Sequence, residues 1–174
     1  MLRVIVGIAL VIAWSSCKTK QETGNLESKT VYYLIRHAEK DRSDPTQENP
    51  ILTHRGKERA QIWARYFDSI SLDTVFSTDY WRTKQTAGPT ATKKGLPITS
   101  YYPKKLVDDE FLWYTKGNRV LIVGHSNTTP MLVNQLLGEE RFPDMDDSDN
   151  SSLYVVTFQG DEKHVEVRKV DLPQ

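Results

Sequence analysis

The sequence predicts an α/β domain built as a three-layer sandwich, with helices on both faces of a mostly parallel central sheet. The chain has 174 residues, enough for one domain and too few for two ordinary ones. Short, uncharged, β-prone segments also alternate with longer segments of helical periodicity. The clearest β-prone segments are residues 31–35, 74–77 and 120–123, and the helical segments are residues 53–69, 80–94 and 129–137.

The first predicted strand, residues 31–35, carries no charge and therefore suits a buried position in a sheet. Residues 41–50 are polar and contain two prolines, which is typical of a loop. The helix predicted at residues 53–69 has Thr53 as its N-cap, and its apolar residues recur at helical spacing. A short strand follows at residues 74–77.

The next helical segment covers residues 80–94, with Pro89 expected to bend or split it and Gly95 to end it. We expect a strand at residues 98–102 and a short helical stretch over residues 104–115.

The helix at residues 129–137 can hold Pro130 in its first turn. The acidic run at residues 144–149 lacks the spacing and the late glutamate of a calcium loop, so it is interpreted as a solvated loop. Residues 153–158 and 165–170 alternate as strands around turn-forming residues, which predicts a hairpin.

The N-terminus is typical of a bacterial lipoprotein that is exported to the cell envelope. Arg3 precedes a short apolar run and small residues, which is the pattern of a signal peptide over residues 1–16. The apolar run is shorter than the roughly 20 residues of a membrane-spanning helix. The single cysteine, Cys17, follows directly and would carry the lipid that anchors the chain to the membrane. An ordinary secreted protein with a free thiol is the alternative. Residues 17–29 are polar and should form a flexible tether, so the folded domain would span residues 30–174.

Composition excludes several function classes. Lys and Arg total 23, Asp and Glu also total 23, and the formal net charge is zero, so nothing global indicates a nucleic-acid partner or a basic membrane-binding face. One cysteine allows neither a disulfide framework nor a cysteine-based zinc site.

Unusual chemistry follows three of the predicted strands. Arg36 and His37 follow the first strand, Arg82 opens the helix after the second, and His125 follows the strand at residues 120–123. Sites in such sheets gather outside the carboxyl ends of the strands. We therefore expect two histidines and two arginines to meet at one rim.

These residue types suit phosphoryl transfer. A neutral imidazole is a competent nucleophile, and nearby arginines would lower the pKa of His37 from its usual value of about 6.5 and keep it neutral. Arg36 and Arg82 can hold phosphate oxygens through paired donors, and His125 can donate another hydrogen bond. Backbone N–H groups at the start of the following helix add an anion site. Phosphoryl transfer needs mainly positioning and charge stabilisation, and this set supplies both.

Four segments resemble, in the same order, the signatures of the histidine phosphatase superfamily, the phosphoglycerate mutase-like proteins. Residues 34–39 (LIRHAE) are similar to its Arg-His-Gly signature, with Ala38 in place of the glycine. Residues 52–61 (LTHRGKERAQ) resemble its Leu-Thr-x-x-Gly helix start. Residues 77–87 (STDYWRTKQTA) resemble its Ser-x-x-x-x-Arg-x-x-Gln-Thr-Ala element, and residues 123–126 (VGHS) match its second-histidine motif.

The resemblance implies a phosphoglycerate mutase-like fold and a phosphatase that needs neither a metal nor an organic cofactor. His37 would be the phosphorylated nucleophile, and water would then release phosphate from the phosphohistidine. The phosphate pocket would consist of Arg36, Arg82 and His125. The candidate substrate contacts are Ser126, Asn127 and Thr128, of which Ser126 and Thr128 would first cap the helix. The substrate would be a phosphorylated small molecule or a phosphoprotein.

Many larger members carry an acid that protonates the leaving group, between the elements of Arg82 and His125. The candidates at that place are Asp108, Asp109 and Glu110. Glu39 is a further candidate, although a pairing with Arg36 or Lys40 is an equal expectation for it. Without such an acid, substrates with good leaving groups are favoured, such as phosphoramidates, anhydrides and aryl phosphates. The chain also lacks the insertions that form a lid in larger members, and so resembles the small, open phosphatases of the superfamily.

Three other functions compete with this hypothesis. The domain could be an anchored phosphate-binding module with little turnover, or a phosphoglycerate mutase-type phosphotransferase, which needs the acid and the lid. Residues 124–128 (GHSNT) also resemble a nucleophile elbow, which would make Ser126 an esterase nucleophile with His164 as its base. The esterase hypothesis leaves Arg36 and Arg82 unexplained.

Overall fold

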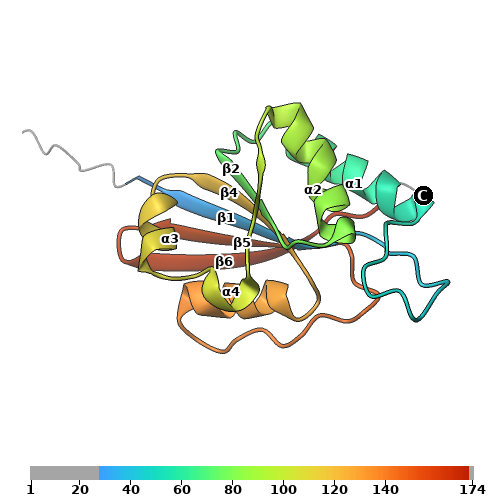
Figure 1. Cartoon of the computed structure of the whole chain (residues 1–174). Helices are drawn as coiled ribbons and strands as arrows, with labels where there is room; N and C mark the ends of the chain where they lie inside the picture. Colours follow the sequence, from blue (N-terminus) through green and yellow to red (C-terminus); the bar gives the residue numbers. More distant parts are fainter. Residues whose placement is uncertain (1–27, 173–174) are drawn as a thin grey trace, which may run out of the picture.

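The computed structural model describes residues 28–172 of the chain. Its middle layer is a six-stranded sheet in the order β3-β2-β4-β1-β5-β6 (Figure 1). The strands are β1 (Thr30–Arg36), β2 (Thr74–Ser77), β3 (Ile98–Ser100), β4 (Arg119–Gly124), β5 (Ser152–Gln159) and β6 (Glu162–Lys169). Strands β1 to β4 are parallel to one another, whereas β5 pairs antiparallel with both β1 and β6. The predicted mostly parallel α/β sheet is confirmed.

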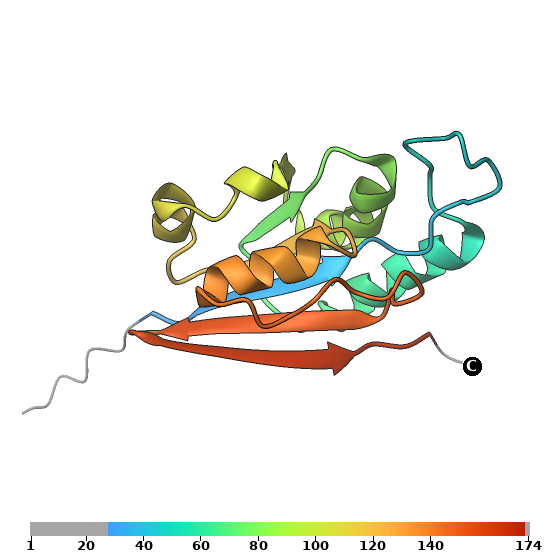
Figure 2. The same cartoon turned by 90° about the horizontal axis from the view of Figure 1, so that it is seen from below.

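Helices cover both faces of the sheet (Figures 1 and 2). The helices α1 (His54–Tyr66) and α2 (Trp81–Lys94) lie on one face. The other face carries α4 (Thr128–Leu137), α3 (Asp109–Tyr114) and the 3-10 turn η1 (Pro103–Lys105). The three layers are those predicted from the alternation of strands and helices.

Two cores fill the space between these layers. Successive side chains of a strand point to opposite faces, so odd-numbered residues of β1 pack under α1 and α2, and even-numbered ones under α3 and α4. Trp63 and Phe67 are fully buried on the first side, and Leu132 and Leu136 on the second. The uncharged strands predicted from the sequence thus form the centre of the molecule.

The start of α1 lies against the segment that leaves β1. Thr53 is the N-cap, as predicted, and its hydroxyl accepts a hydrogen bond from the N–H of Gly56 at 3.0 Å. A Cβ at Gly56 would lie 2.2 Å from the carbonyl oxygen of Glu39, so only glycine permits this approach. The Leu-Thr-x-x-Gly segment therefore fixes the position of α1 relative to the end of β1.

Several predicted boundaries are corrected. Helix α1 ends at Tyr66, and α2 continues through Pro89 as one helix. A proline removes one intrahelical hydrogen bond, and the buried residues Ala87 and Ala91 on either side of it hold α2 against the sheet. Residues 104–115 form η1 and α3 rather than one helical stretch, because the carboxylate of Asp108 caps a new helix by accepting from the N–H of Phe111 at 2.8 Å.

The C-terminal hairpin is confirmed, with Gly160 in its turn at φ 59°, a left-handed conformation that favours glycine. The predicted signal peptide at residues 1–16, the lipidation site Cys17 and nearly all of the tether at residues 17–29 lie outside the described residues. Within residues 28–172, we find no helix that is both long and apolar enough to cross a membrane.

The close approach at Gly56 generates a prediction. Gly56→Ala should lower the free energy of unfolding by about 1–3 kcal/mol, because the added methyl group would collide with a backbone oxygen. Urea denaturation followed by circular dichroism measures the change. The matched control is Gly88→Ala in α2, where an added Cβ meets nothing within 4 Å and the effect should stay below about 1 kcal/mol. Equal effects of the two substitutions would contradict the proposed packing.

Candidate active site

A cavity of about 600 Å³ opens where β1, β2 and β4 end. Arg36, His37, Arg82 and His125 all line it, as the positions of these residues after the strands predicted. The sheet register explains this convergence: Arg36 is opposite Gly124, and Val123 of β4 also pairs with the last residue of β2.

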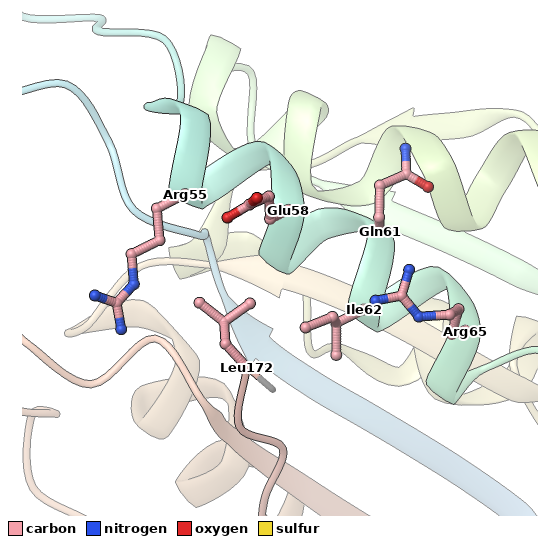
Figure 3. Close-up of a pocket in the computed structure, with 6 residues that line it drawn as sticks. All are labelled: Arg55, Glu58, Gln61, Ile62, Arg65 and Leu172. Atoms are coloured by element: carbon pink, nitrogen blue, oxygen red, sulfur yellow. The ribbon is translucent and has the colours of Figure 1, made fainter. Parts of the chain in front are cut away.

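A larger cavity, of about 790 Å³, lies along the outer face of α1 (Figure 3). It is lined by Arg55, Glu58, Gln61, Ile62, Arg65 and Leu172. Five of these six side chains come from one helix, and none is a histidine, serine or cysteine. The cavity at the strand ends is therefore the candidate active site.

His37 lies deep in this cavity and is only 3% exposed. Its Nδ1 lies 2.7 Å from the carbonyl oxygen of Ala38. A carbonyl can only accept, so Nδ1 carries the proton of the neutral ring and Nε2 keeps its lone pair. Burial lowers the pKa of His37 to about 3, and the charge of Arg36 acts in the same direction. At neutral pH the ring is therefore uncharged.

The backbone around His37 is held from two sides. The side-chain amide of Asn150 donates to the carbonyl of His37 at 2.9 Å, and the hydroxyl of Thr86 in α2 accepts from the N–H of Ala38 at 2.9 Å. The N–H of His37 itself donates to the carbonyl of Gly124 at 2.9 Å. These contacts fix the imidazole in the cavity.

His125 lies beside His37, with the ring centroids 5.4 Å apart. Its Nδ1 lies 3.4 Å from Nη2 of Arg82, and its Nε2 lies 2.9 Å from the hydroxyl of Thr78. A guanidinium only donates, so Nδ1 accepts and Nε2–H donates to Thr78. Burial lowers the pKa of His125 to about 4, and Arg82 contributes to the shift. Both histidines are thus neutral, and the arginines supply the positive charge.

Arg36 is 2% exposed, and its guanidinium is held by the C-terminal part of the chain. Nη1 donates to the carbonyls of Asp146 at 3.0 Å and Asp149 at 3.3 Å, and Nη2 donates to the carboxylate of Asp147 at 2.5 Å. The Nε–H groups of Arg36 and Arg82 are buried without a hydrogen-bond partner among residues 28–172. A bound oxyanion would satisfy such donors.

Residues 144–149 form a largely exposed loop, as predicted, and this arrangement gives the loop a further part at the site. Asp147 forms ion pairs with both Arg36 and Arg42, the latter at 2.6 Å, and it lines the cavity. A buried guanidinium requires carbonyl and carboxylate partners, and this loop supplies them. The acidic run therefore belongs to the candidate site.

None of the four predicted acids lines the cavity. Asp108 caps α3, and Asp109 and Glu110 lie in its first turn. Helix α3 precedes the start of β4, at the opposite end of the parallel strands from the cavity (Figure 1). Glu39 pairs with the buried guanidinium of Arg59 at 2.8 Å rather than with Arg36 or Lys40.

Two carboxylates of the described chain do line the cavity, Asp79 and Asp147. Sequence reasoning missed both as candidate acids, although Asp79 stands within the segment around Arg82 and Asp147 within the acidic run. Asp79 is ion-paired with Lys84, and Asp147 with the two arginines.

The segment after His125 also lines the cavity. The hydroxyl of Thr128 accepts from the N–H of His125 at 2.9 Å, whereas Asn127, at the N-cap of α4, makes no side-chain cap bond. Ser126 accepts a hydrogen bond through its carbonyl from the N–H of Met145, which ties it to the acidic loop. All three predicted substrate contacts are thus at the cavity.

The structure does not bring Ser126 and His164 together. His164 of β6 pairs with Thr157, which in turn pairs with Val31 near the start of β1. Ser126 follows the end of β4, at the other end of the sheet. The esterase pair considered from the sequence is therefore not assembled.

Comparison with known proteins agrees with the fold. Residues 32–101 match the sequence profile of the histidine phosphatase superfamily (branch 1). This stretch contains His37 and Arg82. His125 lies beyond the matched stretch and joins the site through the geometry described above. No curated protein matches the sequence.

Solved structures share the phosphoglycerate mutase-like fold. A protein of Agrobacterium tumefaciens named as a candidate phosphohistidine phosphatase, SixA, is 22% identical, with a TM-score of 0.58, over 80% of this chain and 97% of that one. Phosphoglycerate mutase from Bacillus anthracis str. Sterne is 14% identical, with a TM-score of 0.61, over 81% of this chain and 93% of that one. Phosphoserine phosphatase from Entamoeba histolytica is 14% identical, with a TM-score of 0.59, over 78% and 94% of the two chains.

The contact between Asp147 and Arg36 generates a prediction about anion binding. Asp147→Asn removes a carboxylate that occupies one donor of Arg36, so inorganic phosphate should bind about threefold to tenfold more tightly. Isothermal titration calorimetry with phosphate measures this affinity.

The matched control is Asp144→Asn, which makes the same charge change at an exposed position of the same loop and should leave phosphate affinity unchanged. Weaker phosphate binding by Asp147→Asn would show instead that Asp147 holds Arg36 in its binding position.

Proposed function

We propose that this protein is a metal-independent phosphatase that hydrolyses phosphomonoesters or phosphoramidates through a phosphohistidine at His37. The observation that carries the proposal is the environment of this ring. Its Nδ1 is held by a backbone carbonyl, so its Nε2 keeps the lone pair, and His125, Arg36 and Arg82 line the same cavity.

In the first step, Nε2 of His37 forms a bond to phosphorus while the bond to the leaving-group atom breaks. The leaving group departs with the electron pair and takes a proton from solvent. Arg36 and Arg82 offset the charge on the phosphoryl oxygens, and the neutral His125 stands beside them. Water then attacks phosphorus, the bonding electrons return to Nε2, and the proton of the water passes to solvent.

A phosphate-binding module with little turnover is the second candidate. It is favoured by one observation: the two carboxylates that line the cavity in the described chain are both held in ion pairs and are not free to protonate a leaving group. A mutase-type phosphotransferase needs such an acid and is less well supported.

Turnover of p-nitrophenyl phosphate in the presence of EDTA tests the proposal. The wild-type protein should be active, and His37→Ala should lower kcat by at least about a thousandfold, because it removes the nucleophile. His54→Ala is the control, since His54 is exposed on α1 and should not affect turnover. Activity that survives His37→Ala, or that EDTA abolishes, would sink the mechanism. Phosphate binding without turnover would favour the binding module.

We also propose that the chain is exported and anchored to a bacterial membrane through a lipid on Cys17. Arg3, the apolar run, the small residues and the single cysteine support this proposal. In cells fed labelled palmitate, the wild-type chain should carry label and fractionate with membranes. Cys17→Ser should lose the label. A labelled variant, or a wild-type chain without label, would refute the anchor.

A further inference from the structure

Aromatic side chains gather on one flank of the cavity mouth. Tyr80 follows β2 and is 41% exposed, and Tyr102 follows β3 and is 81% exposed; both line the cavity together with Pro103. Strands β2 and β3 are parallel neighbours, so these residues lie on the same flank. An exposed aromatic ring forgoes the stabilisation of burial, and at the mouth of a polar cavity it indicates a ligand contact.

The opposite flank of the mouth is charged. Lys40 follows β1 and lines the cavity, and Asp147 joins it from the loop that precedes β5, paired with Arg42. The cavity therefore has a basic floor that suits a phosphoryl group, one charged flank and one aromatic flank. A ligand that matches the floor and the aromatic flank carries its phosphoryl group on an apolar, planar body.

We propose that Tyr80, Tyr102 and Pro103 form a subsite for an aromatic leaving group, and that the substrates are aryl phosphates, with the phosphoryl group on a phenolic oxygen. This inference rests on the proposed phosphatase activity and narrows its substrate class.

The two tyrosines have different parts in this subsite. The guanidinium of Arg82 lies over the ring of Tyr80 at 4.3 Å, and the rings of Tyr80 and His125 are 5.1 Å apart, nearly perpendicular. Tyr80 is thus held in place beside Arg82 and His125. Tyr102 makes no ring–ring or cation–π contact within the described residues, so its ring is available to stack on a ligand.

The chemistry of the cavity favours the same leaving group. Asp79 and Asp147 are both held in ion pairs, so neither offers a proton to a departing oxygen. A phenol has a pKa of about 10, whereas the hydroxyl of water has a pKa of about 16. A phenolate can therefore leave with the electron pair of the broken phosphorus–oxygen bond and take its proton from solvent afterwards. His37 holds the phosphoryl group until water hydrolyses it.

Binding of two inert phosphonates to the full chain tests the subsite without relying on turnover. Benzylphosphonate presents a ring, and propylphosphonate presents an alkyl chain to the same pocket. The wild-type protein should bind benzylphosphonate about threefold to tenfold more tightly than propylphosphonate, the gain expected from one ring–ring contact. Tyr102→Ala should remove this preference by weakening benzylphosphonate binding more than propylphosphonate binding, whereas Tyr102→Phe should keep it.

Tyr114→Ala is the matched control, because Tyr114 is a 56% exposed tyrosine on α3 that does not line the cavity. It should leave both affinities unchanged. Equal affinity of the wild-type protein for the two phosphonates, or a preference that survives Tyr102→Ala, would overturn the aromatic subsite alone. If neither phosphonate binds, the phosphate pocket itself is wrong, and the proposed function falls with it.

Discussion

The parallel pairing of β4 with both β1 and β2 is the constraint on which the rest of the site depends. Val123 of β4 lies opposite Ile35 of β1 and Ser77 of β2, so the three strands end at one level. The residues that follow them are distant in the chain but are delivered to one cavity. The hydrogen bond between Thr78 and His125 joins two such strand ends. A slip of β4 by one residue would turn its core side chains to the wrong face and separate these partners.

The buried charges at this edge of the sheet are stabilised by groups close to them. The guanidinium of Arg36 is held by two carbonyls and a carboxylate, whereas the two histidines avoid a burial penalty by staying neutral. The positive charge of the floor therefore resides on guanidinium groups, which cannot lose their protons at ordinary pH. Fixed donors and a neutral nucleophile are what an anionic phosphoryl group requires, since little reorganisation is then needed as charge develops.

Some acidic side chains stabilise the fold and others line the cavity, and the sequence pattern does not distinguish the two groups. Glu39 neutralises the buried Arg59 and so secures α1 to the segment after β1, and Asp108 starts α3. Asp147, by contrast, lies in the cavity against Arg36. The cavity thus combines a basic floor with carboxylates that are already engaged, which fits leaving groups that depart without help from an acid.

The sequence by itself determined the strands, the convergence at their ends and the identity of the residues there. Uncharged β-prone runs have stable positions only inside a sheet, and the carboxyl ends of parallel strands meet at one edge. The sequence alone therefore predicted that Arg36, His37, Arg82 and His125 meet at that edge. The sequence also predicted that Thr53 caps α1, because this hydrogen bond joins residues only three positions apart.

Only the tertiary structure decided which charges meet. Arg36 and Asp147 are 111 positions apart, and their contact depends on the path of the loop between α4 and β5. The same holds for Glu39, which pairs with Arg59 across the junction of β1 and α1, and for Tyr102, which reaches the cavity because β3 is the neighbour of β2. Local patterns encode burial and periodicity, whereas pairings between loops follow from the register of the sheet and the course of the chain over its edge.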